Sequence, residues 1–473
     1  MRGGTAADAA AALYFALTVT YPVAAGIGGG GVCVVYDAVT QSSESIEFLP
    51  RPAASGGPVA VPGAVRGIAA LHARFGRLRW SEIVLPAEEI ARFGHPVSRA
   101  FATGLADAAR WTTAADARVR AVFAASGRPI EEGENLVQVE LADTLGIIRV
   151  GGGGDFYFGE SARQFVAGSG SSGGRVTLDD LRDLLPEWRT SAAIQFGELT
   201  FFTAPDSPGG APIAAQMWAM LTEDERYQRA GADERAHLIA EVSARAYTDR
   251  AAGAGISAFR AHALMTSYDP GRHNRPPGEP IDLGLWRAPG EDGTTSFVVV
   301  DRRGSAVSCG LTMNMPLGLG RMAGPTGVLM APPLPIGSQS WKIGALDFLA
   351  PIIIAKNFTG EFVFAGAASG GAPAPAAVIQ TALASVLELT GIRAAIDRPR
   401  LFHFGAPDSV FVEPQLQPTL RGALTRRGHR LDETARFGRV NAIVCPAGIS
   451  ESKQACEFAA DGRAYGLGTG GAF

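Results

Sequence analysis

Residues 293–301 read Gly293-Thr294-Thr295-Ser296-Phe297-Val298-Val299-Val300-Asp301, and a second apolar run from Val307 to Thr312 follows the intervening Arg302-Arg303-Gly304. The first run is rich in the β-branched and aromatic residues that strands favour. Gly304 suits the positive-φ position of a short hairpin turn. The sequence therefore predicts a β-hairpin with Thr294 at its start. The local pattern alone indicates nothing more than a turn leading into a strand, because Gly-Thr-Thr is common at such places.

The composition is that of a globular protein with a large core. The chain has 473 residues, of which 47% are hydrophobic and 19% are charged, enough for two or three domains or one large layered unit. Its net charge of −4 comes from 42 basic and 46 acidic residues without long runs of either sign. We therefore expect neither nucleic acid nor a membrane as a partner. The apolar stretch from Ala9 to Val19 is too short for a membrane span.

No signal peptide is recognisable ahead of Gly3, so the sequence as written predicts a cytoplasmic protein, or a periplasmic one if a signal lies upstream. The four cysteines show no CxxC spacing and are expected as buried free thiols, with pairing of the last two in an oxidising compartment as the alternative: Cys33, Cys309, Cys445 and Cys456. The seven histidines are scattered singly, so neither a metal nor another cofactor is expected.

The N-terminal part begins with a predicted helix. Thr5 and Asp8 have the spacing of a capping box, and Ala9 to Leu17 are good helix formers. The glycine run from Gly26 to Gly31 formally matches GxGxxG, but a helix precedes it and a strand follows, the reverse of a dinucleotide site. Close backbone packing is the better interpretation.

Further helices are predicted at Val65–Phe75, Trp80–Arg92, Leu178–Leu181, Arg235–Arg250 and Ala376–Leu389. The glycine-rich stretches 151–154 and 168–174 are expected to be flexible linkers. Residues 252–293 lack periodicity, which predicts an exposed connection leading to Thr294.

A series of short motifs runs from Gly3 almost to the end of the chain. They are Gly3-Gly4-Thr5-Ala6-Ala7-Asp8-Ala9, Gly26-Ile27-Gly28-Gly29-Gly30, Val61-Pro62-Gly63-Ala64-Val65, Pro86-Ala87, Gly94-His95-Pro96-Val97-Ser98, Phe156-Tyr157-Phe158-Gly159, Thr177-Leu178-Asp179-Asp180-Leu181, Ala246-Tyr247-Thr248-Asp249-Arg250, Thr294-Thr295 with Asp301 and Gly304, and Gly370-Gly371 with Gln380. In these motifs and their order, the chain resembles the gamma-glutamyltranspeptidase family of N-terminal nucleophile hydrolases.

The resemblance implies an α+β fold, a four-layer αββα sandwich. It also implies a precursor that cuts itself between Gly293 and Thr294, so that residues 1–293 and 294–473 form one intertwined unit. Thr294 would then be the nucleophile, and its new α-amine, with an ordinary pKa of about 7.7–8.0, would be the base. A glycine before the cut tolerates the strained backbone that an N-to-O acyl shift needs.

The same resemblance assigns further roles. Thr312 would hydrogen-bond to the nucleophile, and Asn314 would contact the substrate's carboxylate end or order the pocket. Gly370 and Gly371 would supply backbone N–H groups to the oxyanion. From the residues alone, Thr312 and Asn314 are equally well explained as strand-end hydrogen-bonding residues.

The sequence departs from the family where a γ-glutamyl group is held. Leu49 stands in place of the clamping arginine, and Arg51, two residues later, is the remaining candidate for substrate binding. Residues 330–335 replace an Asn-Asn segment and its aspartate, residues 347–350 replace a paired-serine motif, and Ser296 replaces a histidine. Leu49 and the Pro332-Pro333 segment are therefore expected to line an altered pocket.

The sequence thus predicts an autoprocessed threonine amidohydrolase or acyltransferase that works through an acyl-enzyme. Its substrate would be a small amide or peptide, less polar than a γ-glutamyl compound. One alternative is a non-catalytic relative that serves as a binding or structural module. Another is ordinary γ-glutamyl transfer, with Arg51 moved into place.

Overall fold

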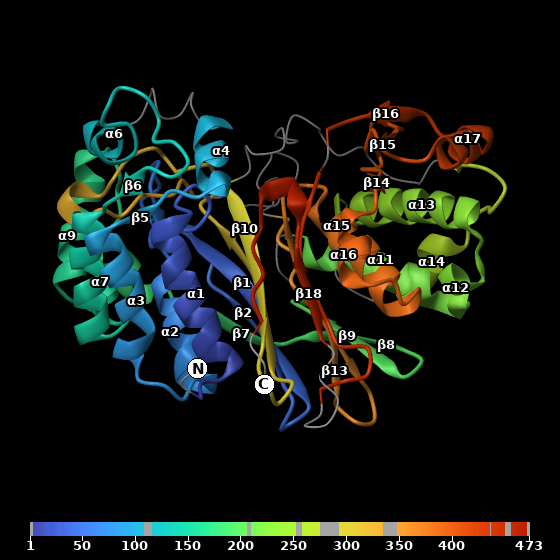
Figure 1. The fold of residues 1–473 in the computed structure, drawn as a ribbon, viewed down its shortest axis with the longest axis horizontal. Coiled ribbons are helices and arrows are strands. Elements are labelled where there is room, and N and C mark those ends of the chain that lie inside the picture. Colours follow the sequence, from blue (N-terminus) through green and yellow to red (C-terminus); the bar gives the residue numbers. More distant parts are fainter. Residues whose placement is uncertain are drawn as a thin grey trace.

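Two antiparallel sheets lie face to face at the centre of the computed structural model (Figure 1). The structure describes residues 3–107, 116–205, 210–251, 258–274, 293–333, 348–435, 437–449 and 456–470. The first sheet has the order β10 (Thr294–Val300), β11 (Ala306–Thr312), β1 (Gly30–Asp37), β2 (Ser42–Glu47) and β7 (Glu187–Thr190). The predicted hairpin is thus confirmed, and its two strands lie at one edge of this sheet.

The second sheet has the order β18 (Glu457–Ala460), β17 (Arg439–Val444), β13 (Phe362–Ser369), β12 (Ile352–Lys356), β9 (Leu199–Thr203) and β8 (Ala192–Phe196). Residues before and after position 293 contribute strands to both sheets. A cut at that position would therefore leave two chains that share both sheets and cannot separate as independent domains.

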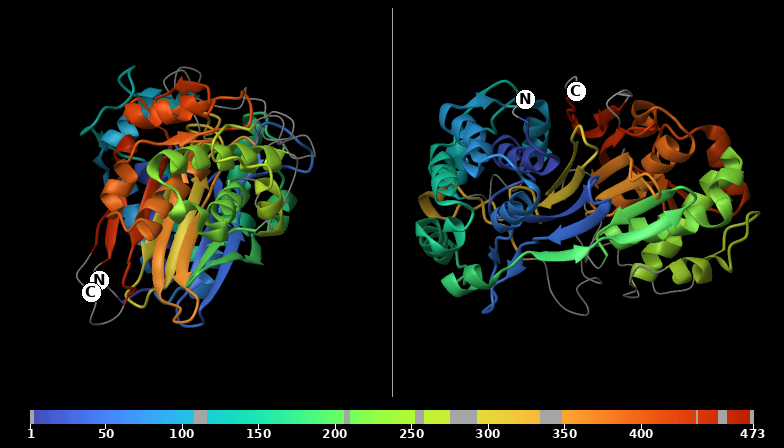
Figure 2. Two further views of the ribbon diagram at one scale, coloured as in Figure 1. Left: turned by 90° about the vertical axis from the view of Figure 1, so that its right-hand side faces the viewer. Right: turned by 90° about the horizontal axis from the view of Figure 1, so that it is seen from below.

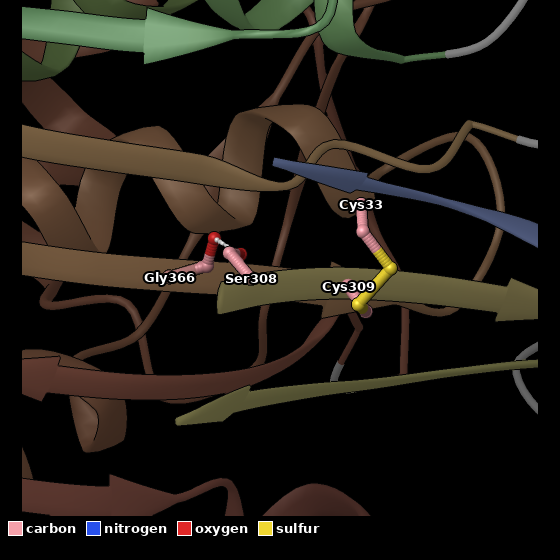
Figure 3. Close-up of a disulfide and its surroundings, with 4 residues drawn as sticks. All are labelled: Cys33, Ser308, Cys309 and Gly366. Carbon is pink, nitrogen blue, oxygen red and sulfur yellow. Dashed lines mark hydrogen bonds between the residues drawn. A yellow bond between two sulfur atoms is a disulfide. The ribbon is translucent and has the colours of Figure 1, made fainter. Parts of the chain in front are cut away.

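Small polar side chains join the facing surfaces of the two sheets. The Ser308 hydroxyl on β11 donates to the Gly366 carbonyl on β13 at 2.8 Å (Figure 3). The Ser296 hydroxyl on β10 donates to the Ala367 carbonyl at 3.1 Å. These bonds satisfy carbonyl groups in a dry interface, where unpaired polar groups are costly. They also fix how β10 is placed against β13, which matters for the site.

Helices cover the outer face of each sheet (Figures 1 and 2). The layer on the first sheet includes α1 (Ala6–Thr20), α2 (Ala64–Phe75), α3 (Trp80–Phe93) and α7 (Val139–Gly151). The layer on the second includes α11 (Ala211–Thr222), α13 (Ala232–Ala251) and α15 (Ala374–Ala382), which continues into a π-helical turn over Leu383–Leu387. Each layer shares a hydrophobic core with its sheet. The α+β, four-layer αββα arrangement is confirmed.

The remaining elements surround these layers. The other described helices are α4 (Arg99–Asp107), α6 (Ala117–Phe123), α8 (Asp155–Phe158), α9 (Glu160–Ser171), α10 (Leu178–Asp183), α12 (Arg226–Arg229), α14 (Ala258–Met265), α16 (Ile392–Asp397) and α17 (Pro418–Arg426). Minor sheets pair β3 (Arg51–Pro52) with β4 (Ala60–Val61), β5 (His95–Pro96) with β6 (Asn135–Leu136), and β14 (Leu401–Phe402) with β15 (Val410–Val412) and β16 (Leu431–Glu433). Among the described helices, none combines the length and apolar character needed to cross a bilayer.

Local chemistry explains the first helix and the glycine run behind it. Thr5 and Asp8 form both bonds of the capping box at the start of α1. A Cβ on Gly28 would lie 2.0 Å from the Leu329 carbonyl oxygen, and one on Gly30 would lie 2.3 Å from that of Phe48. Close backbone packing, rather than a nucleotide site, is therefore the reason for these glycines.

Two expectations about irregular segments were wrong. Gly168 and Gly170 lie within helix α9, and a Cβ on Gly168 would lie 2.2 Å from the backbone of Ala323. The glycine there permits a helix to touch a loop, and the segment is not a linker. Helix α14 lies within the expected connection 252–293. Positions 252–257 and 275–292 of that connection lie outside the described residues.

The expectation of free thiols was also wrong, because all four cysteines are paired: Cys33 with Cys309 and Cys445 with Cys456. Cys33 and Cys309 stand directly opposite each other on β1 and β11 (Figure 3), and 276 positions separate them in the sequence. The pairing of Cys445 with Cys456 is the alternative that the sequence had offered, and the bridge between Cys33 and Cys309 was not foreseen. This first bridge also joins the segments before and after residue 293.

Candidate active site

Thr294 is buried where the two sheets meet. It is the first residue of β10, is 4% exposed and pairs with Thr312 in the register of the hairpin. Its hydroxyl oxygen accepts a hydrogen bond from the Gly370 backbone N–H on the second sheet, with an N–O distance of 3.3 Å. The structure therefore brings the predicted nucleophile and one predicted oxyanion donor into contact, although 76 positions separate them.

The glycine loop that supplies this donor follows β13 directly. Gly370 has φ +109° and Gly371 has φ +71°, conformations that residues with a Cβ rarely adopt. The Gly371 carbonyl accepts from the Ala374 N–H at 2.9 Å, at the point where α15 begins. The turn is thus tied to a helix N-terminus, which collects unpaired N–H groups and favours negative charge.

Tyr247 holds the next residue of the loop from the outer helical layer. Its hydroxyl on α13 donates to the Ala372 carbonyl, and the side chain is fully buried. Burial raises the pKa of Tyr247 far above its ordinary value, so the phenol remains a donor at all physiological pH values. The sequence placed Tyr247 in a motif but gave no sign of this bond.

Gly293, the residue before Thr294, is held by the strand end opposite. It has φ +58°, and a Cβ there would lie only 2.3 Å from the Met315 carbonyl carbon. Its own carbonyl accepts from the Met313 N–H at 2.9 Å. The carbonyl of the predicted scissile bond thus has a backbone donor already in place. Sequence reasoning missed Met313, because a backbone N–H group leaves no trace in the residue type.

Thr312 and Asn314 bond to each other at the end of β11. The Asn314 backbone N–H donates to the Thr312 hydroxyl at 2.8 Å, and that hydroxyl lies 3.2 Å from the Asn314 side-chain oxygen. The Asn314 side-chain amide also donates to the Pro332 carbonyl at 2.8 Å. Asn314 has φ +61°, a conformation that asparagine tolerates better than most residues. These contacts are those of a residue that orders the loop beside the pocket.

Arg51 is held away from Thr294. Its guanidinium group bonds to Glu187 on β7 and lies 3.6 Å from Glu47 on β2. Strands β10 and β2 are three spacings apart in the sheet order, which is about 14 Å at the usual strand separation. The bond from Arg51 lowers the pKa of the Glu187 carboxyl, as an ion pair should. The structure therefore does not bring Arg51 together with the other predicted site residues.

Apolar side chains lie at two positions where the sequence was expected to depart from the family. Leu49 and Leu349 are buried in one small cluster with Val32. Leu349 packs against Gly310 on β11, and Gly310 pairs with Ser296 on β10, two residues after Thr294. Residues 334–347, which include Leu334, Pro335 and Asp347 of the altered motifs, lie outside the described residues. A cavity of about 290 Å³ beside the start of α1 and the turn at Asp301 is at the other end of β10 and is not part of this site.

Comparisons with known proteins identify the family of the chain. The family profile for gamma-glutamyltranspeptidase matches residues 1–332 and 345–467. The glutathione hydrolase proenzyme of Escherichia coli is 26% identical over 93% of this chain and 84% of its own. The capsule biosynthesis protein CapD proenzyme of Bacillus anthracis is 28% identical over 98% of this chain and 86% of its own.

A solved structure has the same fold over nearly the whole length. The cephalosporin acylase from Bacillus halodurans superimposes with a TM-score of 0.79 at 24% identity, over 97% of this chain and 91% of that chain. Because the family profile matches nearly every part of the sequence, the chain belongs to the gamma-glutamyltranspeptidase family.

Proposed function

We propose that this member of the family is an autoprocessed threonine amidohydrolase or acyltransferase, with Thr294 as its nucleophile. One observation carries the proposal. The Thr294 hydroxyl oxygen lies 3.3 Å from the Gly370 backbone nitrogen, and Thr294 directly follows Gly293, a buried glycine with positive φ. The enzyme would be cut between Gly293 and Thr294. Residues 1–293 and 294–473 would then remain together as one catalytic unit.

The cut follows from the groups around the Gly293 carbonyl. The Thr294 hydroxyl attacks the carbonyl carbon, and the Met313 N–H, already 2.9 Å from the oxygen, stabilises the negative charge that develops there. The hydroxyl proton passes to the Thr294 nitrogen as the peptide C–N bond breaks, and an ester forms between the Gly293 carbonyl and the Thr294 oxygen. Water hydrolyses this ester, which leaves a Gly293 carboxylate and a free amine on Thr294.

The same atoms then serve turnover. The new α-amine accepts the proton of the Thr294 hydroxyl, which attacks the amide carbonyl of a substrate. The N–H groups of Gly370 and Gly371 receive the oxyanion, a contribution of about 2.7–4 kcal/mol for each donor in comparable sites. The amine product leaves, and water or a second amine releases the acyl group. Thr312 and Asn314 keep the strand end and the 331–333 loop in place.

The surroundings of Arg51, Leu49 and Leu349 support a substrate that is less polar than a γ-glutamyl amide. Arg51 is engaged by Glu187 and Glu47, so a carboxylate clamp would first have to break both ion pairs. Leu49 and Leu349 are buried apolar residues at the positions where the departures from the family lie. A charge-assisted hydrogen bond is worth about 1.5–3 kcal/mol, so its absence lowers affinity for glutathione substantially.

The experiment compares Thr294→Ala with Thr295→Ala. Thr295 lies next to the nucleophile but points to the opposite face of the strand, so it is the matched control. We expect the Thr295→Ala protein to be cut and Thr294→Ala to remain one chain of 473 residues. The cleaved enzyme is then assayed with a panel of amides of increasing acyl polarity. Faster turnover of a γ-glutamyl anilide than of apolar amides would contradict the proposed substrate class.

A further inference from the structure

Four of the seven histidines converge next to α13, although the sequence scatters them. His237 and Glu241 lie one turn apart on α13, and residues four apart share a helix face. His273 follows α14, His403 follows β14, and His429 lies between α17 and β16. Their spacing in the sequence gave no sign of this convergence.

Three of these side chains present ligand atoms to one another. The Nε2 atom of His237 lies 2.8 Å from the Asp269 carbonyl, which can only accept, so Nε2 carries the proton and Nδ1 has the lone pair. That Nδ1 lies 2.7 Å from Nε2 of His429. The Glu241 carboxylate lies 3.8 Å from the same His429 nitrogen, and all three ligand atoms lie within 4.8 Å of one another.

The groups around these atoms resemble the outer shell of a metal site. A ligating histidine usually donates its other N–H to a carbonyl or carboxylate, as His237 does to Asp269. Glu241 is fixed by Arg245 through one oxygen and by His273 through the other. His237 and Glu241 are 0% exposed and His429 is 4% exposed, so the three atoms are shielded from bulk water.

The ring proton of His429 can move to the other ring nitrogen, whereas that of His403 cannot. Without an ion, Nε2 of His429 carries the proton and donates it to the lone pair on Nδ1 of His237 at 2.7 Å. Nδ1 of His429 is buried and has no hydrogen-bond partner among the described residues, so the proton can move there when an ion takes its place on Nε2. By contrast, Nδ1 of His403 accepts from the Gly405 N–H at 2.8 Å, which places the ring proton on Nε2, facing Asp408. The second cluster, formed by His273, His403 and Asp408, is therefore a hydrogen-bonded network.

We propose that Nδ1 of His237, Nε2 of His429 and the Glu241 carboxylate bind a divalent transition-metal ion of the zinc type. Two imidazoles and one carboxylate are ligands that Zn²⁺ prefers, whereas Mg²⁺ and Ca²⁺ prefer oxygen atoms alone. Two nitrogens bound tetrahedrally to zinc are about 3.3 Å apart, so the two rings would separate by roughly 0.6 Å on binding.

The position of the site indicates what the metal would do. Two ligands, His237 and Glu241, precede Thr294 in the sequence, and the third, His429, follows it. If the proposed cut occurs, the ion would therefore connect the two resulting segments. Helix α13 also carries Tyr247, which bonds to the loop of Gly370. A metal at one end of α13 would therefore brace the helix that positions the oxyanion donors.

The test is metal binding by the full chain after treatment with EDTA and dialysis. Zn²⁺ is titrated by calorimetry, and Co²⁺ is followed by its visible absorption. We expect one ion per chain. Loss of an outer-shell partner lowers metal affinity about 10–100-fold, so His429→Asn, which removes a ligand, should lower it about 100-fold or more. His403→Asn, in the neighbouring network, and His262→Asn, on an exposed side chain, should leave affinity unchanged.

Measurements on wild type and on Thr294→Ala separate this proposal from the cleavage proposal, because the three ligands are present before any cut. The ion should bind equally to both proteins. A folded wild-type chain that binds neither Zn²⁺ nor Co²⁺ would overturn the metal site, and this result does not depend on whether the variants fold. Full affinity in a folded His429→Asn protein would overturn it as well. Either result leaves the role of Thr294 untouched.

Discussion

Replacing Gly293 with alanine should slow autocleavage strongly while leaving the fold intact. An alanine Cβ at this position would lie 2.3 Å from the Met315 carbonyl carbon, where ordinary contacts begin near 3.4 Å. The Met315 atom belongs to the backbone and a Cβ is fixed to its own Cα, so no side-chain rotation relieves the contact and the backbone must shift by about 1 Å. A shift of that size moves the Gly293 carbonyl away from the Met313 N–H and from the Thr294 hydroxyl. Misplacement by about 1 Å costs on the order of 100-fold in rate.

Gly304→Ala is the matched control for this effect. Gly304 also has positive φ, at +87°, but a Cβ there meets nothing closer than 3.6 Å, and it lies at the other end of the hairpin. It should therefore lose stability, by about 1–2 kcal/mol for a left-handed alanine, without losing cleavage. The assay follows the uncut fraction with time on reducing gels. Cleavage of Gly293→Ala at the wild-type rate would refute the argument, as would equal slowing in both variants.

Three further predictions concern the assembled enzyme. Cleaved protein should run as one species near 49 kDa on non-reducing gels and as two on reducing gels, because the Cys33–Cys309 disulfide joins residues 1–293 to residues 294–473. Two species without reductant would contradict this pairing. Tyr247→Phe leaves the buried Ala372 carbonyl without its donor, which costs about 1–3 kcal/mol, so the acylation rate in single turnovers should fall about tenfold. An unchanged rate would exclude a role for Tyr247 in positioning the Gly370 loop. Arg51→Gln should leave kcat/KM for an apolar amide unchanged; a large rise in KM would show that Arg51 reaches the substrate.

Much of the fold was predictable because its signals are local. The hairpin at Thr294 is marked by a run of strand-forming residues and by a glycine in the turn, and the capping box at Thr5 marks the start of α1. Gly168 misled the prediction, since glycine serves both flexible loops and tight helix contacts. Only the neighbouring backbone at Ala323 distinguishes the two cases.

The site was predictable only in part, for a physical reason. Thr294 and Gly370 were found through motifs, but their contact depends on the packing of two sheets. The partner of Cys33 lies 276 residues away, and His237 and His429 are 192 residues apart, so no spacing rule connects them. The donors from Met313 and Tyr247 act on backbone carbonyls. Such bonds depend on strand register and helix position, which the sequence does not display.

N-terminal sequencing of the smaller piece, after reduction and denaturation of the purified protein, tests the proposed cleavage at Gly293. The nucleophile must become the first residue if the Gly293 carbonyl is attacked as the geometry indicates. We expect a piece that begins Thr294-Thr295-Ser296 and that is absent from the Thr294→Ala protein. A cut at any other bond, or a Thr294→Ala protein that still yields the same two pieces, would contradict the proposed cleavage.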